Sequence, residues 1–252
     1  MNKIFIKIFI KIDKKNINNN YYIIEIYMSQ LKISYNNNDI IEIGVDEVGR
    51  GPMFGRVYCA AVILPKGSGF KHELMKDSKK FHSKKKLIET AKYIKENCIA
   101  YAICYENENS VDKHNIKNAT FMAMHSAIKE LLSNIKDKDK YMVLVDGNDF
   151  KPATYFDNKT ETIKEIASAC IIGGDNLYTS IAAASILAKV ERDNYIYEFC
   201  EKYPKLNEYY DLSNNKGYGT AKHMEGIRQH GITIWHRKSF GICSQATIIN
   251  VT

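Results

Sequence analysis

The chain has 252 residues, of which 45% are hydrophobic and 26% charged, as expected for one well-buried globular domain. No apolar run reaches the length of a membrane span, and the six cysteines include no CxxC pair, so the sequence argues against a membrane protein, a zinc site and a disulfide framework. We interpret the cysteines as buried thiols of a protein in a reducing compartment. The net charge of +7 suits a polyanionic partner without establishing one.

Residues 1–30 differ in composition from the rest of the chain. Lys, Ile, Asn and Tyr dominate this segment, and its first lysines interrupt the continuous apolar core that a signal peptide needs. We expect 1–30 to be a low-complexity tail, with Met28 as an equally plausible start, and 31–252 to form the folded domain. The protein is expected in the cytoplasm, with organellar or nuclear targeting left open.

Two apolar runs, Ile40–Val45 and Val57–Leu64, predict a pair of strands near the start of the domain. Asp46 and Glu47 follow the first run and precede the segment Gly49–Gly51. Successive side chains of a regular strand point to opposite faces, so the two acids can serve one site only if the backbone departs from the pleat, which glycine allows. The alternative reading is a solvated turn that joins an antiparallel pair.

Apolar spacing and capping residues predict the next elements. Ser83 caps a helix that runs to about Asn97, and Cys98–Tyr105 forms a third strand. A long helix extends from Ser110 to around Asn134 and precedes a charged loop.

Two further apolar runs each deliver an acid to the end of a strand. Tyr141–Val145 ends in Asp146, and Ala167–Ile172 is followed closely by Asp175. A helix rich in small residues comes next, at Tyr178–Tyr203, and its composition permits close packing against a sheet.

Early antiparallel strands followed by strands that alternate with helices predict an α/β fold, with a mixed five-stranded sheet flanked by helices. A small C-terminal helical extension is expected from about residue 205, with a last helix at about Lys222–Gln229. Ligands of such sheets bind at the carboxyl ends of strands, where the aspartates lie.

One site is therefore predicted from four acids: Asp46, Glu47, Asp146 and Asp175. Crowded carboxylates need cationic compensation, and oxygen ligands without a His or Cys cluster suit Mg²⁺ or Mn²⁺. Two such ions would bind one phosphate, activate water and stabilise the departing 3′ oxygen. The predicted chemistry is metal-dependent phosphodiester hydrolysis, with Asp193 as the alternative to Asp175.

Several motifs occur in a fixed order: DEVGRGP at 46–52, VDGN at 145–148, GGD at 173–175, SIAAASILAKVERD at 180–193, GYGT at 217–220 and HRKSF at 236–240. With these motifs the sequence resembles the type 2 ribonuclease H (ribonuclease HII) family over about Ile40–Phe240. Asp46 and Arg50 favour type 2 over the related type 3 enzymes. The resemblance implies a ribonuclease H-like fold.

The resemblance also implies roles for particular residues. The metal ligands it implies are Asp46, Glu47, Asp146 and Asp175. The ribonucleotide at an RNA–DNA junction would be recognised by the loop Gly49, Arg50 and Gly51 together with Tyr218. Arg50 and Lys79 are candidate phosphate contacts, with Lys80, Lys189 and Arg192 as weaker ones.

Four positions depart from the pattern usual in the family. Phe54 replaces a small residue and Arg56 a common proline, which bears on strand packing. Gly173 stands where lysine is usual, so a positive group near the site would be missing, and Gly219 replaces the proline beside Tyr218.

We therefore expect an endonuclease that hydrolyses the RNA strand of RNA–DNA hybrids, cuts 5′ of single ribonucleotides in duplex DNA and leaves 3′-hydroxyl and 5′-phosphate ends. The alternatives are another nuclease of the ribonuclease H-like fold, such as a resolvase or transposase, and a non-catalytic hybrid-binding protein. The expected partner is a hybrid or a DNA duplex containing ribonucleotides, and the expected state is a monomer. Binding to a sliding clamp is not expected, because Gln245–Ile248 lacks the aromatic residues that a clamp pocket takes.

Overall fold

The computed structural model describes residues 31–36, 39–133 and 140–251. These residues belong to one compact unit that begins at Leu31. The predicted low-complexity tail, 1–30, lies outside the described residues. None of the described helices combines the length and the apolar character that a membrane crossing requires.

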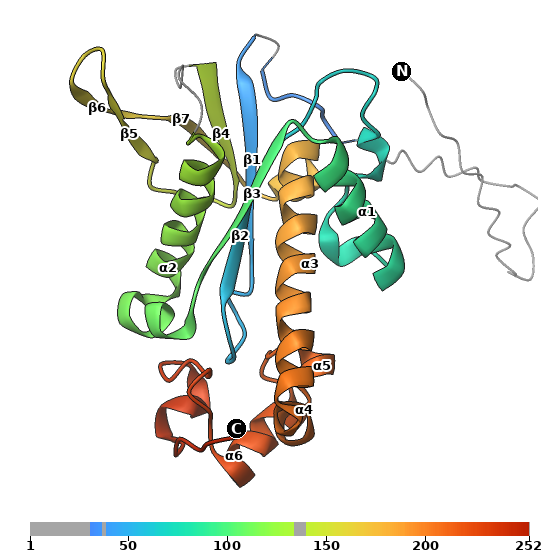
Figure 1. Ribbon diagram of the computed structural model, residues 1–252, viewed down its shortest axis with the longest axis vertical. Coiled ribbons are helices and arrows are strands. Elements are labelled where there is room, and N and C mark those ends of the chain that lie inside the picture. The colour runs from blue at the N-terminus through green and yellow to red at the C-terminus, as the bar shows by residue number, and fades with distance from the viewer. Residues whose placement is uncertain (1–30, 37–38, 134–139, 252) are drawn as a thin grey trace, which may run out of the picture. The chain divides into compact units, whose positions relative to one another are not determined.

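A five-stranded sheet forms the centre of the domain, in the order β3-β2-β1-β4-β7 (Figure 1). Its strands are β1 (Ile41–Val48), β2 (Val57–Ile63), β3 (Ala100–Glu106), β4 (Tyr141–Asp146) and β7 (Ala167–Ile171). Strand β2 pairs antiparallel with both β1 and β3, whereas β4 pairs parallel with both β1 and β7. The mixed sheet predicted from the sequence is confirmed. Because β1, β4 and β7 are parallel neighbours, their carboxyl ends meet at one edge of the sheet.

Helices cover both faces of this sheet (Figure 1). They are α1 (Lys84–Asn97), α2 (Glu108–Leu131) and α3 (Thr179–Lys202). Helix α2 packs on one face, where Val45 and Ala127 share a buried apolar cluster. Helices α1 and α3 pack on the other, where Ala60 and Ala183 belong to a second cluster. Side chains that alternate along a strand therefore enter two different cores.

The first half of α3 is built from small buried residues, and this permits a close approach to β1. A Cβ built on Gly44 of β1 would lie 2.2 Å from the backbone carbonyl carbon of Ser180. Only glycine therefore fits at position 44 without moving the helix. The contact fixes the strand that carries Asp46 against its covering helix.

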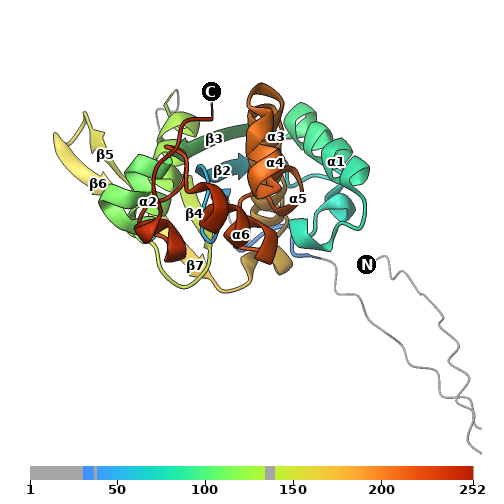
Figure 2. The same cartoon turned by 90° about the horizontal axis from the view of Figure 1, so that it is seen from below.

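The C-terminal part of the domain gathers around the second half of α3 (Figures 1 and 2). Its helices are α4 (Pro204–Tyr210), α5 (Leu212–Asn215) and α6 (Ala221–His230). They enclose a third apolar cluster that includes Phe54, Tyr195 and Ile227. Because Phe54 belongs to the loop after β1, this cluster joins that loop to the C-terminal helices.

Both unusual residues of this loop are accommodated by packing. Phe54 is fully buried. The Arg56 guanidinium carbon lies 3.8 Å from the ring centroid of Tyr105 and 4.6 Å from that of Tyr195, so the cation is held between two aromatic faces.

Capping residues set the helix starts. The Ser83 side chain caps α1, as expected, and the Thr220 side chain caps α6, each by accepting a hydrogen bond from a backbone N–H group. Helix α2 begins at Glu108 rather than at Ser110, because the Asn107 side chain caps it. Its predicted end at Asn134 lies outside the described residues.

A small hairpin was not predicted. It consists of β5 (Thr154–Asp157) and β6 (Thr162–Glu165), with Phe156 opposite Ile163. Each strand has four residues, and these two apolar side chains are largely exposed, so the segment lacks the apolar run that indicates a buried strand.

The interpretation of all six cysteines as buried thiols is wrong. Cys59 and Cys243 are buried, three others are half-buried, and Cys170 is exposed. Cys170 lies on β7, which forms an edge of the sheet. All six cysteines are free, as the sequence indicated.

We predict that Gly44→Ala destabilises the protein by about 1–3 kcal/mol, because the added methyl group overlaps the α3 backbone. Chemical denaturation monitored by circular dichroism measures the change in the free energy of unfolding. Gly67→Ala is the matched control, since nothing lies within 4 Å of a Cβ built there. Equal stability of the two variants would contradict the close packing of α3 on β1.

Candidate active site

Three aspartates meet at the carboxyl ends of the parallel strands. Asp46 lies on β1, Asp146 is the last residue of β4, and Asp175 lies in the short helical turn after β7. One carboxylate oxygen from each lies within 4.8 Å of those of the other two. The convergence expected from the sequence is therefore present for these three residues.

Glu47 reaches the site from the other face of the sheet. Strand β1 keeps its pairing through Asp46 and Glu47, which lie opposite Ala60 and Cys59 respectively. Ala60 belongs to the core under α3, and Cys59 to the core under α2. Consecutive acids thus point to opposite faces, and the departure from the pleat that the sequence suggested does not occur at this position.

Glu47 is nevertheless part of the same electrostatic environment. Its carboxylate is 3.4 Å from the guanidinium of Arg50. Burial raises the pKa of Glu47, the nearby Arg50 lowers it, and Asp146 adds to the increase. The structure thus places Glu47 beside the three aspartates without bringing it into their tight group.

Hydrogen bonds hold each aspartate in place. The backbone N–H of Gly174 donates to Asp146 Oδ1 at 2.7 Å, and the Asn176 side chain donates to Asp175 Oδ1 at 2.8 Å. Asp46 Oδ1 accepts from the N–H of Glu47 at 2.7 Å. These contacts orient the carboxylates without neutralising them.

Burial and mutual repulsion disfavour the ionised forms of these acids. Asp46 is 4% exposed, and desolvation together with Glu47 and Asp146 raises its pKa well above the ordinary value. Desolvation also raises the pKa of Asp175, with further contributions from Asp146 and Asp77. A divalent cation would remove this penalty, and carboxylate oxygens are the ligands that Mg²⁺ and Mn²⁺ prefer. The donor set therefore fits a hard divalent metal ion.

Lys79 supplies positive charge close to Asp175, where it lowers the pKa of that carboxyl group. It lies in a short helical turn whose first N–H groups are capped by the Asp77 side chain. Gly173, which stands where the family has lysine, adopts φ +65° and faces open space. A positive group therefore remains near the aspartates although Gly173 carries none.

The two elements expected to read the ribose lie in contact. A Cβ built on Gly51 would be 3.4 Å from the Tyr218 ring, whose side chain is 45% exposed. Gly49 has φ +97°, a backbone conformation that favours glycine, and it lies against the Arg192 side chain. A larger residue there would be strained and would collide with Arg192. Arg50 is exposed between these glycines.

The alternative fourth ligand is not supported. Asp193 lies outside the aspartate group, and its carboxylate is 2.8 Å from Lys189 Nζ, one helical turn earlier. The same ion pair engages Lys189, which was a weaker candidate for a phosphate contact. Arg192 as a phosphate contact is wrong, because its side chain is fully buried and donates to the backbone carbonyls of Arg56, Phe54 and Lys216.

Residues outside the aspartate group support the site, and sequence reasoning missed Ser78, Asn176 and Asp77 among them. The Ser185 side chain lowers the pKa of Asp46, which burial and the neighbouring acids raise, and its hydroxyl lies 3.0 Å from the Ser78 hydroxyl. Asn176 links Asp175 to Asp77. The signal available for these residues was their position next to Lys79 or inside or beside the GGD and SIAAASILAKVERD motifs.

The chain is similar to proteins of a known family. A family model described as ribonuclease HII matches residues 43–243. The curated ribonuclease HII of Phocaeicola vulgatus is 41% identical to this chain over 212 residues, which make up 83% of this chain and 94% of that protein.

The chain belongs to the ribonuclease HII family.

Members of this family are endoribonucleases that hydrolyse RNA in RNA–DNA hybrids. The assignment to type 2 made from Asp46 and Arg50 is confirmed.

Solved structures agree on the fold. The ribonuclease H2 of Pyrococcus horikoshii OT3 has a TM-score of 0.63 at 21% identity and covers 81% of this chain and 95% of its own. Bst-RNase HIII in complex with Mn²⁺ has a TM-score of 0.52 at 22% identity and covers 77% of this chain and 64% of its own. The ribonuclease H-like fold expected from the sequence is confirmed.

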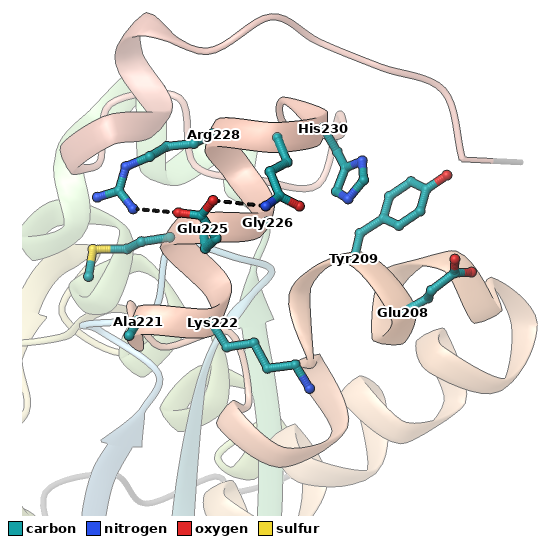
Figure 3. Close-up of a pocket in the computed structure, with 10 residues that line it drawn as sticks. Glu208, Tyr209, Ala221, Lys222, Glu225, Gly226, Arg228 and His230 are labelled. Carbon is teal, nitrogen blue, oxygen red and sulfur yellow. Dashed lines mark hydrogen bonds and ion pairs between the residues drawn. The ribbon is translucent and has the colours of Figure 1, made fainter.

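A separate pocket lies between α4 and α6 of this ribonuclease HII family member (Figure 3). Its lining includes no member of the aspartate group. The Glu225 carboxylate accepts from both Arg228 and Gln229, and the rings of Tyr209 and His230 stack with centroids 3.9 Å apart. Glu225, Arg228 and Gln229 thus satisfy one another, and the pocket lies apart from the aspartate group.

Asp46→Asn is expected to stabilise the metal-free protein and to remove most of its response to Mn²⁺. The substitution deletes a buried charge that opposes folding, so the Tm in EDTA should rise by about 2–4 °C at neutral pH. Mn²⁺ should raise the Tm of the wild type by mass action. Differential scanning calorimetry measures both shifts.

Asp193→Asn is the matched control for this experiment. Its carboxylate pairs with Lys189 away from the aspartate group, so its Mn²⁺ response should equal that of the wild type. A full Mn²⁺ shift in Asp46→Asn would show that Asp46 holds no metal ion.

The raised pKa values also predict a pH dependence of stability without metal. Because the pKa values of Asp46 and Asp175 are higher in the folded state than in the unfolded state, the folded protein binds their protons more tightly. Stability should therefore fall as pH rises from the ordinary carboxyl pKa of about 4 through the raised values. Thermal scans in EDTA across this range should show a smaller fall for Asp46→Asn, and an equal fall would contradict the assignment to Asp46.

Proposed function

We propose that this protein is a metal-dependent endonuclease that hydrolyses the RNA strand of RNA–DNA hybrids and cuts on the 5′ side of single ribonucleotides in duplex DNA. The observation that carries the proposal is the convergence of Asp46, Asp146 and Asp175 at the ends of three parallel strands. Membership of the ribonuclease HII family supports hydrolysis of RNA in hybrids. The products would carry 3′-hydroxyl and 5′-phosphate ends.

The three aspartates, with Glu47 as a fourth ligand, would hold two divalent ions, Mg²⁺ or Mn²⁺. When bound, such ions activate water for in-line attack and stabilise the departing 3′ oxygen. The Mn²⁺ complex of Bst-RNase HIII, a protein of similar fold, supports this choice of metal.

The chain's own cations would complement the substrate's phosphates. Arg50 is exposed beside Glu47, and Lys79 lies near Asp175, so positive groups flank the acidic group at two points. Charge neutralisation of this kind supplies much of the affinity for nucleic acids and makes it depend on salt.

Recognition of RNA requires contact with the 2′-hydroxyl, the group that distinguishes it from DNA. Within the loop Gly49–Gly51, Arg50 and Gly51 are exposed, and Tyr218 lies against Gly51. We assign ribonucleotide recognition to these residues.

The proposed partner is nucleic acid, and the protein is expected to act as a monomer in the cytoplasm. Clamp binding is still not expected. Thr247 and Ile249 make backbone hydrogen bonds with Ile232, so the stretch that begins at Gln245 is packed against the domain.

The decisive test is cleavage of a DNA duplex that contains one ribonucleotide. We expect cleavage on its 5′ side with Mg²⁺ or Mn²⁺, none with EDTA, and none of the same duplex without the ribonucleotide. Asp46→Asn should lower kcat by at least about 10³-fold while duplex binding persists, because only the metal site is lost. Denaturing gel electrophoresis with end-labelled strands measures both the rate and the position of the cut.

Two outcomes would favour the alternatives. Cleavage of the all-DNA duplex at a similar rate would favour a resolvase-type or transposase-type nuclease. Binding of the ribonucleotide-containing duplex without cleavage, whichever divalent metal is supplied, would favour a non-catalytic hybrid-binding protein.

A further inference from the structure

Arg237 is a fully buried arginine whose hydrogen bonds go to backbone carbonyls alone. Its guanidinium donates to the carbonyls of Gly49 at 2.6 Å, Arg50 at 2.9 Å, Pro52 at 2.8 Å and Gly55 at 2.8 Å. A buried charge is costly unless it makes many well-directed hydrogen bonds. The planar guanidinium of Arg237 thus binds four carbonyls of the loop after β1.

This arrangement fixes the direction of the loop's amide groups. The described residues contain no cis peptide bond, and in a trans peptide the C=O and the next N–H point in opposite directions. The carbonyls of Gly49 and Arg50 point at Arg237, so the N–H groups of Arg50 and Gly51 point away from it.

Those two amides are available to a ligand. Arg50 and Gly51 are exposed, and within the described part of the chain neither amide donates to another group. Tyr218 borders the same place, because its ring lies 3.4 Å from a Cβ built on Gly51. Two free donors thus lie beside the Tyr218 ring.

A second chain of hydrogen bonds, which starts at the neighbouring residue His236, holds Tyr218. The N–H of Thr233 lies 3.0 Å from His236 Nδ1, which must therefore accept. His236 Nε2 then carries the proton and donates to His223 Nε2 at 3.1 Å. His223 Nδ1 carries its own proton and donates to the Tyr218 carbonyl at 3.0 Å.

We propose that His236 and Arg237 are positioning residues that set the selectivity for ribonucleotides, Arg237 through the amides of Arg50 and Gly51 and His236 through Tyr218. The inference rests on the proposed function and deepens it. The C-terminal segment that carries both residues thereby joins the two elements of the ribose-reading surface, although it touches none of the three aspartates. A merely structural role would instead weaken all activities together.

Arg237→Lys tests the first half of the proposal. Lysine keeps the positive charge but lacks the planar fork that spans four carbonyls. In the Asp46→Asn background, where the duplex should be bound but not cut, fluorescence anisotropy gives Kd for a duplex with one ribonucleotide and for the same duplex entirely of DNA. The ratio of the two values is the selectivity.

We expect Arg237→Lys to lower this ratio by about tenfold or more, because a site built to bind a hydroxyl loses discrimination when its donors are misplaced. Affinity for the all-DNA duplex should not change, and neither should the Mn²⁺-induced rise in Tm measured in the otherwise wild-type chain. Arg228→Lys is the control, since Arg228 is exposed and pairs with Glu225. A folded Arg237→Lys protein with the wild-type ratio, or one that loses both affinities and the Mn²⁺ response equally, would overturn the proposal.

His223 provides a second pair of variants, which keeps the proposal testable if Arg237→Lys does not fold. Asparagine at this position retains an amide N–H that can donate to the Tyr218 carbonyl, whereas alanine does not. We expect His223→Ala to lower the ratio and His223→Asn to restore at least part of it. Equal Kd ratios in the two variants would contradict the role of the hydrogen bonds that link His236, His223 and Tyr218. Failure of the wild type to cut a ribonucleotide-containing duplex would refute the proposed function separately, because the binding ratios are measured without cleavage.

Discussion

The main constraint on this structure is the repulsion among carboxylates that the fold brings together at the ends of parallel strands. Three aspartates from distant parts of the sequence have oxygens within 4.8 Å of one another, and Asp46 is almost fully buried. The fold compensates this charge only in part, through Lys79 near Asp175, since the hydrogen bonds to the three aspartates come from neutral backbone and side-chain groups. A divalent cation would supply the missing charge, so the repulsion that costs stability would favour metal binding.

The rest of the domain holds these acids in position, and different elements support the acids and the loop after β1. The tight packing of α3 on Gly44 fixes β1, and Ser185 of α3 reaches Asp46. On the other side of the loop after β1, Arg237 and the His236 chain hold the groups that would contact a ribose. The residues proposed to bind metal and those proposed to contact the sugar are thus supported by different elements that meet at β1.

Much of this could be predicted from the sequence. Apolar runs that end in Asp46 and Asp146, and the small-residue helix after Asp175, indicated both the sheet and the meeting of the three aspartates. The opposite orientation of Glu47 could not be predicted, because it depends on whether the β1 pairing continues past Asp46. The hairpin β5–β6 was missed since its strands are short and expose their apolar residues.

Buried arginines were the other failure of sequence reasoning. Arg192 and Arg237 look like phosphate contacts or surface charges in a basic chain, yet both are fully buried and donate to carbonyls. Apart from the Lys216 carbonyl that Arg192 also contacts, their partners are backbone atoms of the loop after β1, more than a hundred residues away in the sequence, and no local pattern indicates such contacts. The meeting of the three aspartates could thus be predicted, whereas the contacts of these two arginines required the structure.

The most direct test of the account is a crystal structure of the protein soaked with Mn²⁺, in which anomalous scattering locates the ions. The account predicts Mn²⁺ coordinated by carboxylate oxygens of Asp46, Asp146 and Asp175. Mn²⁺ bound elsewhere, or Asp146 too far from Asp46 for the two to share the same ions, would contradict it.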